Sequence, residues 1–139
     1  MTPGTLLLNK DFPKHDGSIG NKFLLVLNDG TVFPYITVLI TSKQKNRGTV
    51  FGCQSSDRFP NFFLPKGCCY LDLNSWVQLE EYKEIEQGLM SQRQLENKLK
   101  LICTLSDDLI AAIVNCAIST PDISGNQINE LRRTLANLP

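Results

Sequence analysis

The residues best suited to chemistry in this 139-residue chain are a lysine, two hydroxyls and an acid–amide pair at the ends of strand-like segments. A cation beside hydroxyl groups can hold a phosphate, because the cation balances developing negative charge and the hydroxyls orient the group. The set comprises Lys22, Thr41, Ser42, Asp72 and Asn74. The same residues would also serve as polar ends of strands, and residue chemistry alone leaves both interpretations open.

Other familiar catalytic patterns do not occur in the sequence. It has no P-loop, no dinucleotide-binding glycine fingerprint, no His-Glu-x-x-His and no Gly-x-Ser-x-Gly. The single histidine, His15, lies in a Gly/Pro-rich loop, which is a poor place to hold a catalytic base. The five cysteines form no Cys-x-x-Cys pair, so we expect no metal site, no cofactor, and reduced, partly buried thiols.

Two strands around a turn must position the lysine and the hydroxyls. Residues 22–28 and 35–41 are rich in apolar and β-branched side chains, and Asp29-Gly30 between them is a strong hairpin signal. Lys22 begins the first strand and Thr41 ends the second. Alternation along the second strand predicts one face with Tyr35, Thr37, Leu39 and Thr41, and another with Ile36, Val38 and Ile40.

Further short strands and loops follow the same rhythm. The sequence predicts strands over residues 4–10, 49–53, 68–73 and 75–80, with a short apolar run at 61–64. It predicts loops over residues 11–21 and 42–48, where Gly, Pro or basic residues gather. Strands at such short spacing favour a small antiparallel barrel.

The period changes to helical in the last third of the chain. Ser91-x-x-Gln94 reads as a capping box that opens a helix carrying Leu95, Leu99 and Ile102 on one side. Ser106-Asp107-Asp108 and Ser124-x-x-Gln127 predict two further helix starts. The expected fold is therefore mainly β with about three C-terminal helices.

Charge and composition suit a single globular domain. Apolar residues make up 42% of the chain and its net charge is zero. Residues 1–70 hold eight basic and four acidic residues, whereas residues 71–139 hold six and ten. Lys43, Lys45, Arg47 and Arg58 form a basic stretch that suits a polyanion or simply a solvated loop. With no signal-like or membrane-spanning segment, we expect a cytoplasmic protein without membrane contact.

Two segments resemble the core of the MazF/PemK toxins. They are Gly-Asn-Lys-Phe-Leu-Leu-Val-Leu at 20–27 and Tyr-Ile-Thr-Val-Leu-Ile-Thr-Ser at 35–42. Gly4-Thr5-Leu6 resembles the family's opening strand, residues 71–85 a later strand, and residues 88–102 its closing helix. The resemblance implies an SH3-like barrel, shared with CcdB, over residues 1–103. Residues 104–139 would be a helical extension packed on that barrel or at an interface.

The same resemblance implies a function. Such toxins are homodimeric endoribonucleases that cut single-stranded RNA without a metal and are neutralised by an antitoxin protein. By position, the family's arginine falls on Lys22, its hydroxyl on Thr41 beside Ser42, and its acid on Asp72 or Asn74. The implied RNA-binding surface would use His15, Lys43, Lys45 and Arg47, with Phe59, Phe62 and Phe63 either stacking on bases or packing in the core.

The sequence also departs from the family pattern. Lys22 lacks the planar fork of an arginine, Phe23 stands where proline is usual, and Asn74 would remove the acid. These differences leave open a divergent nuclease and a non-catalytic barrel that binds or inhibits a target such as gyrase. A third alternative is an interaction protein that docks partners through its C-terminal helices.

Overall fold

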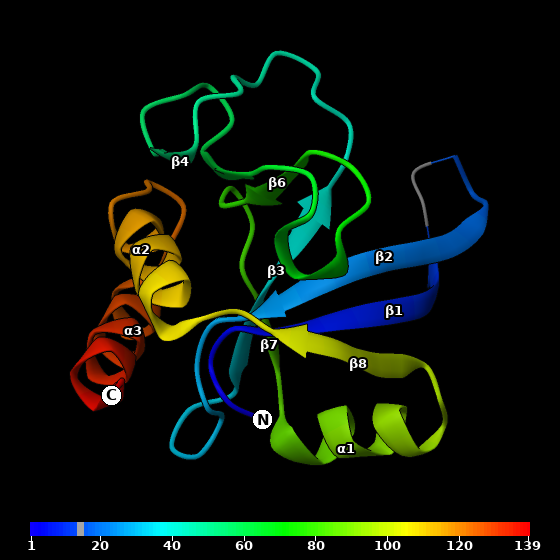
Figure 1. Ribbon diagram of the computed structural model, residues 1–139. Coiled ribbons are helices and arrows are strands. Elements are labelled where there is room, and N and C mark those ends of the chain that lie inside the picture. The colour runs from blue at the N-terminus through cyan, green and yellow to red at the C-terminus, as the bar shows by residue number, and fades with distance from the viewer. Residues whose placement is uncertain (14–15) are drawn as a thin grey trace.

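The computed structural model describes residues 1–13 and 16–139 and is mainly β, as predicted, with three α-helices. Figure 1 shows the arrangement. The elements in chain order are β1 (Thr5–Pro13), β2 (Ile19–Val26), β3 (Tyr35–Thr41), β4 (Gly52–Gln54), β5 (Asn61–Leu64), the 3-10 turn η1 (Cys68–Tyr70), β6 (Ser75–Gln78), β7 (Lys83–Ile85), α1 (Gln87–Leu95), β8 (Leu99–Thr104), α2 (Asp107–Ile118) and α3 (Gly125–Asn137).

All eight strands form one antiparallel sheet. Their order is β4-β5-β6-β3-β2-β1-β8, and β7 pairs with the first half of β3. Among the described residues no ladder joins β4 to β8, so the sheet is open and does not close into the predicted barrel. β4 has only three residues and offers little backbone to close on. The finer SH3-like assignment stays a prediction.

The two faces of the sheet are covered by different helices (Figure 1). On one, the helix-pair face, Ile36, Val38 and Ile40 join the core with α2 and α3. On the other, the α1 face, Met90 of α1 packs among a smaller buried cluster that includes Tyr35. This division confirms the alternation predicted along β3, since side chains of successive residues point to opposite faces.

Both edge strands are tied by cysteine pairs, and this corrects the expectation of reduced thiols. Cys53 of β4 is disulfide-bonded to Cys116 of α2, with their Cα atoms 5.5 Å apart. Cys69 of η1 is bonded to Cys103 of β8, with a Cα separation of 6.3 Å. Cys68 is the free cysteine of the described residues. The partners lie 63 and 34 residues apart, so local spacing could not reveal them.

The last two helices begin where their caps predicted. The Ser106 side chain accepts a hydrogen bond from the Leu109 amide, and Ser124 and Gln127 form a reciprocal capping box. The first helix was predicted wrongly. It begins after Glu86 rather than at Ser91, and residues 99–104 form an edge strand paired with β1. Leu99 and Leu101 follow the two-residue period of a strand. The prediction missed it because Leu95, Leu99 and Ile102 also fit the spacing of a helix.

Three smaller predictions also need correction. The loop expected over residues 11–21 is shorter, because β1 continues to Pro13 and β2 starts at Ile19. The strand expected over residues 68–73 is instead η1, which follows Gly67 in a left-handed conformation with φ 92°. The strand expected over residues 49–53 begins later, at Gly52.

The described residues contain no helix with the length and apolar character needed to cross a bilayer.

Candidate functional site

Lys22 and Thr41 lie next to each other on the α1 face. Phe23 pairs with Ile40, so one further step along each strand places Lys22 beside Thr41. Lys22 also pairs with Asn9 on its other side, and Thr41 pairs with Trp76. We call Asn9, Lys22 and Thr41 the polar row. On the same face, two residues further along each strand, is an apolar row of Leu7, Leu24 and Leu39. Leu7 and Leu24 belong to the buried cluster under α1.

Neighbouring side chains of the polar row are close enough to share one ligand. Directly opposed residues of an antiparallel pair have Cβ atoms about 5 Å apart. Lys22 and Asn9 are half-buried, whereas Thr41 is 7% exposed. The row therefore presents an ammonium, a hydroxyl and an amide from three adjacent strands to one side of the sheet.

The Thr41 hydroxyl is already oriented by the backbone. Its Oγ1 accepts a hydrogen bond from the Lys43 amide at 3.1 Å. A hydroxyl has one donor and two acceptor positions, so this contact leaves its proton available to a ligand oxygen. The contact also joins the end of β3 to the start of the following loop, residues 42–48, which we call the basic loop.

The remaining predicted site residues come from two neighbouring segments. Ser42 follows Thr41 directly and is exposed. Asp72 and Asn74 lie on the connection before β6, at the same end of the sheet as Thr41, because Thr41 pairs with Trp76. Asn74 Oδ1 accepts the Lys66 amide at 2.8 Å, which gives Asn74 a role in shaping its own loop. Asp72 is exposed and is the one acid of the two residues.

The basic loop separates into surface and buried cations. Lys43 and Lys45 are exposed. Arg47 is buried: its Nη1 donates to the Lys43 carbonyl at 3.1 Å and its Nη2 lies 3.3 Å from Glu80. Arg47 therefore stabilises the basic loop from inside and joins it to Glu80, and it is not part of an exposed RNA-binding surface. His15 lies outside the described residues.

Trp76 ties the same loop to the sheet. Its Nε1 donates to the Gly48 carbonyl at 2.8 Å, and its ring lies 5.3 Å from that of Phe63. Phe62 and Phe63 are buried and belong to the core, as the packing interpretation of these aromatics predicted. Phe59 is half-buried beneath the guanidinium groups of Arg47 and Arg58.

Two aromatics that the sequence did not single out are exposed instead. Phe51 is 61% exposed and Tyr70 is 80% exposed. Tyr70 lies two residues before Asp72, in a left-handed conformation with φ 66°. Exposed aromatic rings can stack on unpaired bases. Their exposure depends on the tertiary structure, and no motif around either residue announces it.

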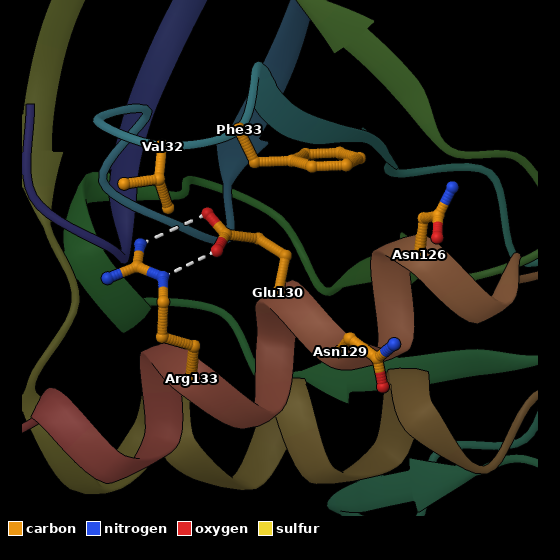
Figure 2. Close-up of a pocket in the computed structure, with 6 residues that line it drawn as sticks. All are labelled: Val32, Phe33, Asn126, Asn129, Glu130 and Arg133. Carbon is orange, nitrogen blue, oxygen red and sulfur yellow. Dashed lines mark hydrogen bonds and ion pairs between the residues drawn. The ribbon is translucent and has the colours of Figure 1, made fainter.

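A second polar cluster joins α3 to the β2–β3 turn. Figure 2 shows the guanidinium of Arg133 facing the carboxylate of Glu130, with Val32 and Phe33 of the turn above α3. Arg133 donates to both Glu130 oxygens, at 2.6 and 3.1 Å, and to Asp29 at 2.9 Å. The buried Asn28 amide donates to Glu130 at 2.7 Å and to the Pro34 carbonyl at 3.0 Å.

The groups of this second cluster satisfy one another. Burial by itself raises the pKa of Asp29, but hydrogen bonds from Thr31 and Arg133 outweigh it and lower that pKa below its usual value. Hydrogen bonds to Glu130 and Asp29 raise the pKa of Arg133. The cluster therefore joins α3 to the β2–β3 turn by hydrogen bonds and ion pairs. Because its polar groups already bind one another, the polar row is the better candidate for binding a ligand.

Comparison with known proteins adds no assignment. No protein-family model matches the chain, and no curated protein matches it.

Proposed function

We propose that this protein is a toxin-like, metal-independent endoribonuclease that cuts single-stranded RNA at the polar row. The observation that carries the proposal is the pairing register, which sets Lys22 and Thr41 side by side on neighbouring strands. A phosphodiester bound there would meet a cation and a hydrogen-bond donor. Both would bind the equatorial oxygens more strongly as negative charge grows in the transition state.

The proposed reaction is an internal transfer. The 2′-hydroxyl attacks the adjacent phosphorus, the bond from phosphorus to the 5′-oxygen breaks, and the products carry a 2′,3′-cyclic phosphate and a 5′-hydroxyl. One proton leaves the attacking hydroxyl and one joins the leaving oxygen, so atoms and charge balance without water or metal. Asp72 is the proposed general base, because its carboxylate is exposed at the same end of the sheet.

Exposed groups around the row would bind the rest of the strand. Lys43 and Lys45, which follow Thr41 in the chain, supply cations for neighbouring phosphates. Tyr70 is an exposed ring on which a base farther along the strand could stack. As further parts of the proposal, the protein acts as a homodimer and an antitoxin-like partner blocks this surface. Light scattering of the purified protein measures the first of these.

The proposed substrate places the activity in the cytoplasm. Cytosolic reductants open accessible disulfides, so the activity has to survive reduction of both cysteine pairs. Cleavage assays with and without dithiothreitol measure this directly. An activity that requires intact bridges would contradict the cytoplasmic location and favour an oxidising compartment.

Single substitutions in the row test the proposed function. We expect Lys22→Ala and Thr41→Val each to slow cleavage of a defined single-stranded RNA in EDTA by about 100- to 1,000-fold, the usual loss for one transition-state donor. Lys10→Ala removes an exposed cation from the neighbouring strand and should leave the rate near that of the wild type. A wild-type protein that cuts no RNA, and does not arrest growth when expressed, contradicts the proposal.

A non-catalytic binding module is the second candidate, and the low exposure of Thr41 favours it. Only 7% of the surface of Thr41 is exposed, so its hydroxyl has little access to a scissile phosphate. A protein of this kind would bind a 2′-deoxy oligonucleotide, which cannot be cut by this route, and leave the matching RNA whole. A gyrase-directed inhibitor would also leave RNA whole, but it would trap DNA breaks.

A further inference from the structure

We infer that Asn9 is a third ligand of the phosphodiester at the polar row. This inference rests on the proposed function and adds to it a residue that the sequence pattern did not single out. Asn9 belongs to β1, where it pairs with Lys22 on one side and with Leu99 on the other. It is the member of the row farthest from Thr41, so the lysine lies between two neutral hydrogen-bonding groups.

The direction of Asn9 follows from the strand. Side chains alternate along β1, so Asn9 shares the α1 face with Leu7, whereas Leu8 and Lys10 lie on the opposite side. Two flanking positions on that face, Leu7 and Leu99, are buried and apolar. The Asn9 amide therefore lies between two buried leucines on its own strand and edge neighbour, and directly across from the Lys22 cation.

The Asn9 amide is available to a ligand. Within the part of the chain that the structure describes, no hydrogen bond engages its side chain. The residue is half-buried, so its amide is partly shielded from water yet remains reachable. By contrast, Asn28 and Asn61 use their amides to hold neighbouring backbone carbonyls. Asn9 thus has donor capacity that the fold does not consume.

The chemistry of the amide suits an anionic oxygen. An asparagine NH₂ group donates up to two hydrogen bonds and carries no charge. Placed beside Lys22, it can bind the second non-bridging oxygen of the same phosphate while Thr41 binds from the other side. One phosphate would then be bound by side chains from three strands, with the Lys22 ammonium between the two neutral groups.

The test compares two substitutions at Asn9 by cleavage rate and by affinity for a 2′-deoxy oligonucleotide that cannot be cut. Asn9→Ala should lower the cleavage rate and the affinity by about tenfold to a hundredfold, the usual effect of losing a hydrogen bond to a charged group. Asn9→Asp should be worse than Asn9→Ala, because it sets a carboxylate against the phosphate. Its excess loss should shrink as salt rises, since salt screens the repulsion. A merely structural role would produce neither the order nor the salt dependence.

Asn21→Ala is the matched control. Asn21 is an exposed asparagine one residue before Lys22, and alternation directs it to the opposite face. It should cut and bind like the wild type, and thermal unfolding should confirm that every variant is folded. If Lys22→Ala is inactive but Asn9→Ala equals the wild type, the assignment of Asn9 is wrong and the proposed function stands. If the wild type binds the 2′-deoxy oligonucleotide but does not cut RNA, the affinity of Asn9→Ala alone tests the assignment of Asn9. If the wild type neither cuts nor binds, both the proposed function and the assignment of Asn9 are wrong.

Discussion

At the scale of single residues, Tyr82 shows how one buried polar group couples the sheet to the helices. Its hydroxyl lies 2.7 Å from the Thr120 hydroxyl, beyond the end of α2. Burial is the largest influence and raises the pKa of Tyr82 to about 12, while the hydrogen bond with Thr120 acts in the opposite direction. The fold therefore favours the neutral phenol. Nothing in the sequence around Tyr82 predicts this contact, because Thr120 lies 38 residues away.

This shift predicts how stability depends on pH. The folded pKa is raised above the ordinary value of 10, so the contribution of Tyr82 is complete below pH 10 and is lost as pH rises towards 12. Tyr82→Phe should lower the free energy of unfolding by about 1 kcal/mol at pH 7, through loss of the hydrogen bond. The difference between wild type and variant should then narrow at alkaline pH.

Urea denaturation of both proteins at pH 8 and pH 11 measures the effect. Tyr70→Phe is the control, because Tyr70 is 80% exposed and should unfold like the wild type at both pH values. A constant gap between wild type and Tyr82→Phe across this range would show that the neutral phenol is not what the fold stabilises.

At the scale of elements, each edge strand of the open sheet is anchored by a disulfide. β4 and β8 end the sheet, and exposed edges invite pairing with other chains. Cys53–Cys116 anchors β4 to α2, and Cys69–Cys103 anchors β8 to the connection between β5 and β6. Each bridge thus holds a covering segment against one edge.

Removing either bridge should therefore destabilise the protein. The bridges join residues 63 and 34 positions apart, and closing loops of this size stabilises by about 2–4 kcal/mol. We expect this loss for Cys53→Ser/Cys116→Ser and for Cys69→Ser/Cys103→Ser in denaturant titrations. Cys68→Ser, which alters the free and half-buried thiol, should cost less than either pair. Double variants as stable as the wild type under oxidising conditions would refute a stabilising role.

Elements with strong local signals could be predicted from the sequence, and those decided by distant partners could not. β3 has the predicted bounds because alternation is clear, and α2 and α3 begin at their caps. β8 was missed because its leucines fit a helical spacing as well, and pairing with β1 decides the outcome. At the site, the hairpin alone brings Lys22 and Thr41 together. The burial of Arg47 depends on Glu80, 33 residues later, and the position of Asn9 depends on the register of β1.

At the scale of the whole molecule, the last two helices complete the main core. Ile110, Ile113 and Val114 of α2 and Leu131 of α3 are fully buried with the helix-pair face of the sheet. Glu130 is hydrogen-bonded to Asn28, which is also fully buried and accepts the Ile36 amide at 2.7 Å. The apolar faces of α2 and α3 are therefore packed against the sheet.

This sharing predicts the result of truncation. A chain that ends at Thr104 would expose the apolar side chains of the helix-pair face, an area too large for a stable soluble monomer. We expect it to bind the dye ANS, to lose near-ultraviolet circular dichroism and to unfold without a sharp transition. Leu131→Ala, a milder change to the same core, should remain folded and lose about 2–5 kcal/mol of its free energy of unfolding.

Leu95→Ala is the control for that substitution, because Leu95 is 85% exposed and its removal should change the free energy of unfolding little. A truncated chain that stays monomeric, unfolds cooperatively and keeps the affinity of the full chain for a 2′-deoxy oligonucleotide would show instead that α2 and α3 are a separable interaction element.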